Sequence, residues 1–198
     1  MPEVFEKIMR GWDMTYNCYE INYDLDPTIR SKLLDQAYCT HFRNFVGAKS
    51  GSTYDLKVAS TAFEIDKTPL IERMTSLVNP SLTVEGCVYL YFEPNKTIPP
   101  HIDDSLRRTS AITWALSPDI KNFAPVLFHD ENDNLERVFH YSNKPLILNT
   151  RYKHSVKNNS YHRYSFQICL QNSIEELIEF DQENGILQDW KKFVAGGF

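Results

Sequence analysis

The sequence predicts a mainly antiparallel β core with helices packed against it, folded as a single domain. Short runs rich in β-branched and aromatic residues follow one another closely between residues 84 and 170. Turn-forming clusters such as residues 130–134 (DENDN) separate these runs, and no helical pattern intervenes. Strands at this density favour an antiparallel sandwich or barrel over βαβ units. The length of 198 residues suits one core with an elaborated terminus.

The first part of the chain, residues 1–83, is expected to be a flank of mixed helical and strand character. An Asp-Pro pair at 26–27 supplies an N-cap followed by proline at the first helical position, and apolar residues then recur at helical spacing as far as Phe45. A Thr-Pro pair at 68–69 repeats this start signal ahead of a second helix. Between the two helices, residues 56–63 are expected to form a strand.

Six strands are expected in the β core, where apolar and β-branched residues dominate each run. They are residues 84–92, 109–116, 124–129, 136–141, 145–149 and 163–170. The pattern then returns to helical spacing over residues 174–180 and again over 187–194. The single domain thus comprises the N-terminal flank (1–83), the β core (84–170) and a C-terminal helical segment (171–198).

Composition and charge exclude several classes of protein. A formal net charge of -5 speaks against a nucleic-acid binder, although the locally basic segment 151–163 leaves a short anionic ligand open. The four cysteines form no CxxC pair, which indicates reduced core cysteines in an intracellular protein. No apolar run suits a membrane span, and the charged N-terminus does not resemble a signal peptide. We therefore expect a cytoplasmic protein without a membrane partner.

The stretch 99–108 (PPHIDDSLRR) is a candidate metal-binding corner. Residues i and i+2 of an extended segment point to the same side, so His101 and Asp103 can reach one ion. The two prolines before them stiffen the entry to this corner. Asp104 is the alternative carboxylate, but it should point to the opposite face. Taken alone, the motif would more often be a surface ion pair.

Partners for this corner occur further along the chain. A non-haem ferrous site commonly uses two histidines and one carboxylate on one face of the metal and leaves three positions open. His154, which follows an apolar strand, is the best candidate for the third ligand. Arg163 and Ser165 share one face of the next strand and together can bind a carboxylate. Singly, His154 would more often be a hydrogen-bonded loop histidine, and Arg163 an exposed strand charge.

The combination of H-I-D at 101–103, a distal His154 and R-Y-S at 163–165 resembles the iron(II)- and 2-oxoglutarate-dependent oxygenases. The resemblance extends over roughly the last three-fifths of the chain, on the strand periodicity of that family. It implies a mainly β fold with flanking helices and a double-stranded β-helix (jelly-roll, cupin-like) core. The N-terminal flank matches the helices of the family only in general character.

The resemblance also implies roles for individual residues. The iron ligands, and with them the catalytic residues, would be His101, Asp103 and His154. Arg163 would pair with the distal carboxylate of 2-oxoglutarate, and Ser165 would donate a hydrogen bond to it. A strand residue beside the metal motif often contacts the cosubstrate in this family, so Tyr91 or Tyr89 is expected to do so.

The implied activity is an iron(II)- and 2-oxoglutarate-dependent dioxygenase, a hydroxylase that uses O2 and releases succinate and CO2. The compact size and acidic charge favour an amino-acid-like small molecule or a protein side chain as substrate. A non-catalytic β-helix binding or assembly module is one alternative. A nucleic-acid-modifying oxygenase is another, which the absence of further arginines directly after Arg163 makes less favoured. The sequence does not indicate the oligomeric state.

Three further histidines compete as metal ligands. His129 and His140 end expected strands on either side of the acidic turn, where they could be cross-strand neighbours, and we interpret His129 as structural. His162 directly precedes Arg163 and should face away from the pocket on a regular strand. One of the arginines at 107–108 could meet an anionic group of substrate or cosubstrate, the alternative being a solvated loop.

Overall fold

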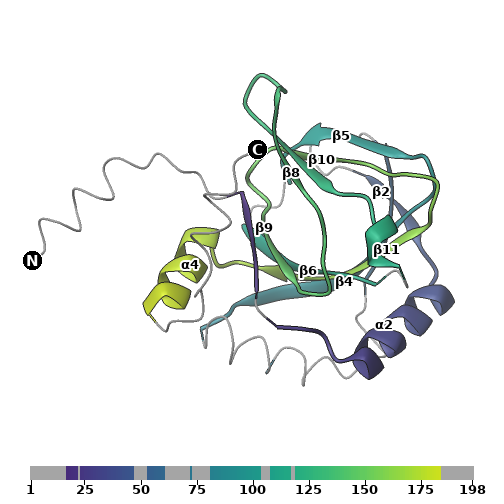
Figure 1. Cartoon of the computed structure of the whole chain (residues 1–198), viewed down its shortest axis with the longest axis horizontal. Coiled ribbons are helices and arrows are strands. Elements are labelled where there is room, and N and C mark those ends of the chain that lie inside the picture. Colours follow the sequence, from purple (N-terminus) through teal and green to yellow (C-terminus); the bar gives the residue numbers. More distant parts are fainter. Residues whose placement is uncertain are drawn as a thin grey trace, which may run out of the picture.

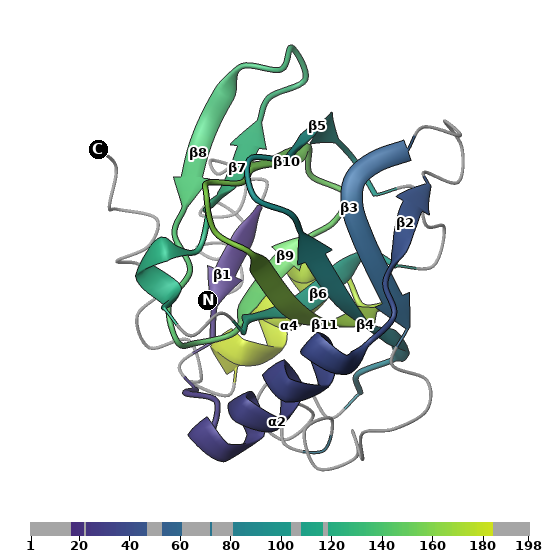
Figure 2. The same cartoon turned by 90° about the vertical axis from the view of Figure 1, so that its right-hand side faces the viewer.

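The protein consists of two β sheets that face each other, with helices on the outer side of the larger sheet (Figures 1 and 2). The computed structural model describes residues 17–21, 23–46, 53–60, 72, 81–103, 108–116 and 119–183. Among these residues, none of the helices has both the length and the apolar character needed to cross a membrane.

The larger sheet has seven strands, and all of its pairings are antiparallel. In spatial order these are β1 (Cys18–Glu20), β9 (Leu146–Asn149), β6 (Ser110–Ala115), β11 (Arg163–Leu170), β4 (Val84–Phe92), β3 (Thr53–Ser60) and β2 (Arg43–Val46). The smaller sheet has four antiparallel strands. Its order is β5 (Thr97–His101), β10 (His154–Lys157), β7 (Val126–His129) and β8 (Leu135–Phe139).

Two helices and one short 3-10 turn complete the described elements: α2 (Pro27–Cys39), α4 (Ile174–Glu183) and η1 (Ile120–Asn122). The start of α2 follows from its sequence, because the Asp26 carboxylate accepts hydrogen bonds from the backbone N–H groups of Thr28 (2.7 Å) and Ile29 (3.2 Å). Leu33 and Ala37 of α2 are buried against the larger sheet. Both helices thus cover the apolar outer face of that sheet.

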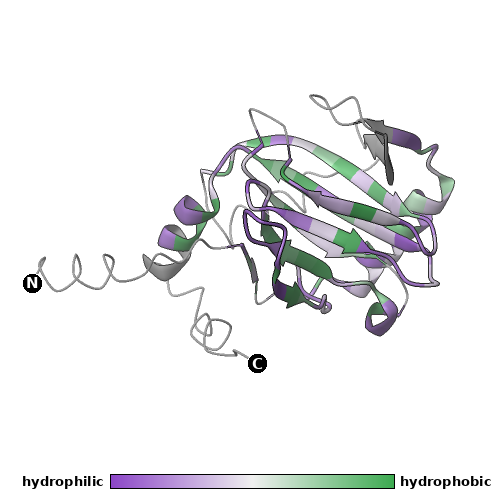
Figure 3. Cartoon of the chain, turned by 90° about the horizontal axis from the view of Figure 1, so that it is seen from above, coloured by the Kyte–Doolittle hydropathy of each residue, from purple (hydrophilic) through white to green (hydrophobic). Residues whose placement is uncertain are grey.

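Strand β11 lies between β4 and β6, and its side chains point alternately to the two faces of the larger sheet. Phe166 and Ile168 point outward into the core beneath the helices. Arg163, Ser165 and Gln167 alternate with them and line the space between the two sheets. Figure 3 shows hydrophobic and hydrophilic residues alternating as bands along the strands. The two-residue period of one strand therefore directs its polar side chains toward the interior.

The predicted fold class, mainly β with flanking helices and a jelly-roll core, is confirmed. Each of the six strands expected in the β core is present, with ends shifted by at most two residues. The strand expected at 56–63 lies at Thr53–Ser60 instead. The second expected helix, after 68–69, lies outside the described residues apart from Glu72, which is helical, and so does the segment 187–194.

The first helix is shorter than its apolar pattern predicts. The pattern continues to Phe45, but the helix ends at Cys39. Thr40 has extended backbone angles (φ -86°, ψ 137°), and its hydroxyl donates to the carbonyl of Gln36 at 2.6 Å. Residues Arg43–Val46 then form β2 on the edge of the sheet. The run of apolar residues at helical spacing is thus divided between two elements, the helix α2 and the strand β2.

Replacing Phe166 by alanine is expected to lower the free energy of unfolding by about 3–5 kcal/mol. The ring is 1% exposed and contacts the rings of Tyr89 (5.4 Å between centroids) and Trp114 (5.9 Å), so its loss leaves a cavity. Urea denaturation followed by fluorescence measures the change. Val138→Ala, on an exposed position of β8, is the control and should change stability by less than about 0.5 kcal/mol. Equal effects of the two substitutions would contradict the assigned core.

Candidate metal and carboxylate site

Three side chains that can ligate a metal converge between the sheets: His101, Asp103 and His154. Their ligand atoms all lie within 4.8 Å of one another. Strand pairing brings them together, because β5 and β10 are antiparallel neighbours and place His101 directly opposite His154, with ring centroids 4.5 Å apart. Asp103 is fixed beyond the end of β5 by a hydrogen bond from its backbone N–H to the carbonyl of Thr150 (3.0 Å).

Both histidines are oriented by backbone carbonyls. The Nδ1 atom of His101 lies 3.0 Å from the carbonyl oxygen of Pro99, and that of His154 lies 2.8 Å from the carbonyl oxygen of Tyr152. A carbonyl can only accept, so each Nδ1 carries the proton and each Nε2 presents a lone pair. This arrangement is the usual way in which proteins orient metal-binding imidazoles.

The electrostatics of the three residues suit a metal ion. Burial lowers the pKa of His154 despite the opposing effect of the Asp103 carboxylate, so the imidazole is neutral. Burial alone would raise the pKa of Asp103, but the neighbouring side chains of His101, His154 and Arg108 outweigh it, so its pKa lies well below the usual range. A neutral imidazole and an ionised carboxylate are the forms that bind a metal. The donor set of two nitrogens and one oxygen therefore fits a divalent iron site with open positions.

A cavity of about 160 Å³ extends from these three residues between the sheets. Its walls are largely apolar, with side chains from both sheets, among them Leu90, Phe92, Ile98, Val126 and Val156. Polar groups from β6 and β11 cross its floor, where the Gln167 amide donates to the Thr113 hydroxyl at 2.9 Å. The cavity thus joins the metal-ligating residues to Arg163 and Ser165.

Arg163 is buried in the wall of this cavity with only 4% of its surface exposed. Its guanidinium lies over three aromatic rings, those of Phe92 (5.0 Å), Phe123 (4.5 Å) and Tyr141 (5.2 Å). One nitrogen, Nη2, donates to the Tyr141 hydroxyl at 3.1 Å. Nε and Nη1 have no hydrogen-bond partner among the described residues. Buried charged donors without partners are rare because they are costly, so this end of the cavity is chemically suited to an anion.

Tyr91 does not contribute to the cavity, and the expectation for this residue was wrong. Leu90 and Phe92 of β4 point into the cavity, so Tyr91, between them, points to the other face of the sheet. There its hydroxyl lies 2.8 Å from Nδ1 of His162, and its ring stacks on Tyr164 with centroids 4.7 Å apart.

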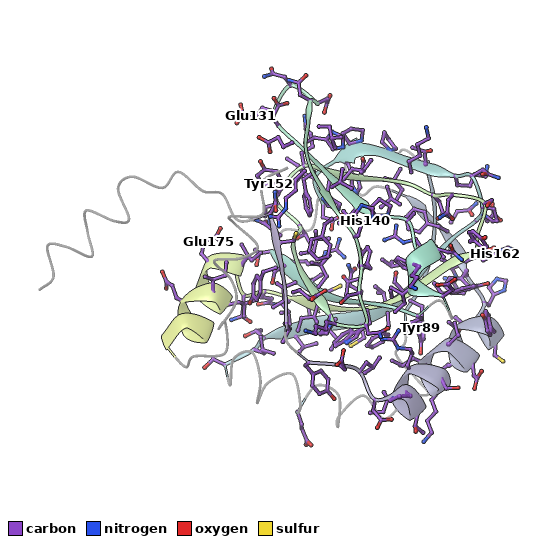
Figure 4. All side chains as sticks on the ribbon, viewed as in Figure 1. Tyr89, Glu131, His140, Tyr152, His162 and Glu175 are labelled. Carbon is purple, nitrogen blue, oxygen red and sulfur yellow. The ribbon has the colours of Figure 1, made fainter. Side chains whose placement is uncertain are left out.

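Tyr89, the other tyrosine considered, also faces away from the cavity and is buried in the core beneath the helices. Figure 4 shows His162 at the margin of the molecule. His162 therefore faces away from the pocket, as its place next to Arg163 predicts.

The remaining histidines are not part of the metal-ligating group. His129 is buried, and its Nε2 lies 2.7 Å from the Ser155 hydroxyl, which agrees with a structural role. His129 and His140 are not cross-strand neighbours, because His129 pairs with Leu135 while His140 lies beyond the opposite end of the hairpin. His140 is exposed.

Of the two arginines after the metal motif, Arg108 lies in the cavity wall and forms an ion pair with Asp103. Residues 104–107 lie outside the described part of the chain, so the alternative carboxylate Asp104 and Arg107 are not placed. Sequence reasoning missed Tyr141, Thr113 and Gln167. Gln167 carried a usable signal, since it lies four residues beyond Arg163 on the same strand face. Tyr141 comes from a loop and carried none.

Comparison with known proteins agrees with this geometry at the level of the fold. Neither a protein-family model nor a curated protein matches the sequence. A prolyl hydroxylase from Trichoplax adhaerens, solved with a peptide of the hypoxia inducible factor, superposes with a TM-score of 0.59 at 16% identity, covering 90% of this chain and 96% of that one. A prolyl-4-hydroxylase from Pseudomonas putida gives a TM-score of 0.58 at 12% identity, over 79% of this chain and 92% of that one.

A third structure shares the fold but is named for a different reaction. The non-haem α-ketoglutarate-dependent epimerase SnoN of nogalamycin biosynthesis gives a TM-score of 0.58 at 14% identity, over 86% of this chain and 83% of that one. The chain thus has the jelly-roll fold of the 2-oxoglutarate- and iron(II)-dependent oxygenases. The similar solved structures include prolyl hydroxylases and an epimerase from nogalamycin biosynthesis.

Proposed function

We propose that this protein is an iron(II)- and 2-oxoglutarate-dependent oxygenase. The observation that carries the proposal is the buried Arg163 guanidinium, whose Nε and Nη1 have no partner among the described residues, in the same cavity as two histidines and one carboxylate. 2-Oxoglutarate, a keto acid with two carboxylates, has one group for each end of this cavity. Its keto acid portion can chelate a metal, and its distal carboxylate can meet the arginine. A buried arginine alone, or a metal-ligating triad alone, can serve other ligands. The two together in one cavity match 2-oxoglutarate bound to iron.

The residues of the cavity have separate roles in this proposal. Iron is held by three side chains, His101, Asp103 and His154. Arg163 and the hydroxyls of Tyr141 and Ser165 hold the distal carboxylate, and the apolar walls exclude water from the space between. When bound, iron and 2-oxoglutarate supply the oxidising chemistry, in which O2 is consumed and 2-oxoglutarate is converted to succinate and CO2.

We propose hydroxylation as the reaction, with an amino-acid-like small molecule or a protein side chain as the substrate. The prolyl hydroxylases among the similar structures support this choice, one of which was solved with a peptide. The net charge of -5 is unsuited to a nucleic-acid substrate. One of the similar structures is an epimerase, so the products must be analysed to distinguish hydroxylation from epimerisation. The four free thiols agree with a single-domain protein of the cytoplasm.

Turnover of 2-oxoglutarate tests this proposal directly. The purified protein is incubated with ferrous iron, ascorbate, O2 and 2-oxoglutarate, and succinate is measured by mass spectrometry, with pools of amino acids and peptides as substrates. We expect succinate only when iron, O2 and 2-oxoglutarate are all present, and faster release with the right substrate. Omission of iron and replacement of 2-oxoglutarate by the non-oxidisable N-oxalylglycine are the controls. A folded, iron-loaded protein that forms no succinate with any pool would favour a non-catalytic binding module.

Replacing Tyr141 by phenylalanine is expected to weaken 2-oxoglutarate binding about fivefold. The change removes one hydroxyl beside the carboxylate site, and a single hydrogen bond contributes about 1 kcal/mol. Isothermal titration of the manganese-loaded protein with 2-oxoglutarate measures the effect. Tyr161→Phe, at a 53% exposed position, is the matched control and should bind as the wild type does. Unchanged binding in Tyr141→Phe would remove this residue from the carboxylate site.

A further inference from the structure

The two carboxylate oxygens of Asp103 face different partners. Oδ1 lies 3.6 Å from Nε2 of His101, on the side where the three metal-ligating groups converge. Oδ2 forms an ion pair with Nη2 of Arg108. One oxygen of the carboxylate thus pairs with Arg108, while the other faces the histidines.

Arg108 is itself fixed from several directions. Its Nη1 donates to the Sγ atom of Cys169 at 3.4 Å, on the strand that also carries Arg163. Its carbonyl accepts from the hydroxyl of Thr150 at 3.4 Å, and the carbonyl of Thr150 accepts the backbone N–H of Asp103 at 3.0 Å. The side chains of Arg108 and Asp103 are only 18% and 12% exposed. A charge-assisted hydrogen bond between mostly buried, well-held groups is strong and directional.

From these contacts we infer that Arg108 is a positioning residue for the metal centre, which makes Asp103 a ligand through one oxygen only. A carboxylate with one oxygen held by a guanidinium offers the other to the metal in a fixed orientation, whereas a carboxylate without this contact must lose rotational freedom when it binds. Two imidazoles and one oxygen leave three coordination positions open, and a second carboxylate oxygen would fill one of them. The inference rests on the proposed function, because it assumes that the three residues hold a metal.

A different role for Arg108 would be to meet an anionic group of substrate or cosubstrate. The ion pair with Asp103 argues against this role, because Nη2 would have to leave a mostly buried carboxylate to reach an external anion. The cavity already contains a guanidinium for an anion, that of Arg163. The two roles predict different losses when Arg108 is replaced, since one acts on metal affinity and the other on affinity for the organic anion.

The experiment measures the binding of manganese(II) alone, by electron paramagnetic resonance, to the full chain and its variants. Arg108→Gln is expected to bind manganese about 10- to 100-fold more weakly, as loss of a residue that orients a metal ligand typically does. Arg108→Lys restores a positive charge near Asp103 and should recover part of the affinity. At saturating manganese, Arg108→Gln should bind 2-oxoglutarate as the wild type does. Arg151→Gln, at an exposed arginine, is the control and should leave both affinities unchanged.

Three results would overturn this inference. Manganese affinity in Arg108→Gln equal to that of the wild type would show that Asp103 needs no such support. A selective loss of 2-oxoglutarate affinity would assign Arg108 to the organic anion instead. An equal loss in Arg108→Gln and Arg108→Lys, accompanied by a lower melting temperature of both metal-free variants, would show a packing role. Failure of the wild type to bind manganese at all is distinguishable from these, because it would contradict the proposed function itself.

Discussion

Replacing Arg163 by methionine is expected to weaken 2-oxoglutarate binding by about 30- to 1000-fold, which corresponds to about 2–4 kcal/mol. The guanidinium is buried in the cavity wall, and two of its nitrogens have no hydrogen-bond partner among the described residues. Methionine has a similar length but cannot donate a hydrogen bond. Isothermal titration with the manganese-loaded protein measures the loss, and metal affinity should be unchanged because the metal-ligating residues are not touched.

In the absence of ligand, the same substitution should make the folded protein more stable. A buried charge with unpaired donors destabilises the unliganded protein by about 1–3 kcal/mol, so methionine is expected to raise its melting temperature. Arg43→Met, at an exposed arginine of β2, is the control and should change neither binding nor stability. Normal 2-oxoglutarate affinity in Arg163→Met would refute the assignment of the carboxylate site.

Replacing Asp103 by asparagine is expected to weaken metal binding by more than about 100-fold, beyond the typical effect of losing a residue outside the ligand set. The substitution preserves the size of the side chain, but a neutral amide is a much poorer ligand for a divalent ion than a carboxylate. It also removes the negative charge that faces two histidines and Arg108. Succinate formation should fall to background, since no oxidation of 2-oxoglutarate proceeds without the metal.

Asp35→Asn is the matched control for this substitution. Asp35 is exposed on α2, far along the chain from the metal motif, and its replacement should leave manganese affinity unchanged. Circular dichroism of both variants separates loss of metal from loss of fold. A folded Asp103→Asn protein that binds manganese as tightly as the wild type would exclude Asp103 from the metal site.

The sequence was informative about the site where chemistry and strand periodicity agreed. His101 and Asp103 were paired by their two-residue spacing, and Arg163 and Ser165 by the same rule on another strand. These side chains, with His154, do line one cavity. Their residue types are rare in a β core without a function, so their pattern was visible against an apolar background.

The sequence was misleading where both faces of a strand are covered. In β4, Leu90 and Phe92 face the cavity, while Tyr89 and Tyr91 face the helical side. Alternation separates these two pairs, but it cannot tell which pair faces inward when both faces carry large apolar or aromatic side chains. The resemblance to the oxygenase family suggested one of the tyrosines as a contact of the cosubstrate, whereas Leu90 and Phe92 line the cavity.

Strands β5 and β10 were missed for a related reason. The segment before His101 contains two consecutive prolines, which indicate a turn, but β5 lies at the edge of the smaller sheet, where missing N–H donors are tolerated. β10 is only four residues long. Such strands exist because a partner pairs with them, and the residues that bring that partner close lie far away in the sequence. Their composition therefore does not reveal them.

The central claim is that one cavity binds iron and 2-oxoglutarate together, and an anaerobic titration tests it most directly. Ferrous iron is added to the oxygen-free protein, followed by 2-oxoglutarate, and the visible absorption spectrum is recorded. We predict a metal-to-ligand charge-transfer band that saturates with 2-oxoglutarate in the wild type. The band should be absent in Asp103→Asn and need far more 2-oxoglutarate in Arg163→Met. A folded wild-type protein that develops no band under these conditions would contradict the claim.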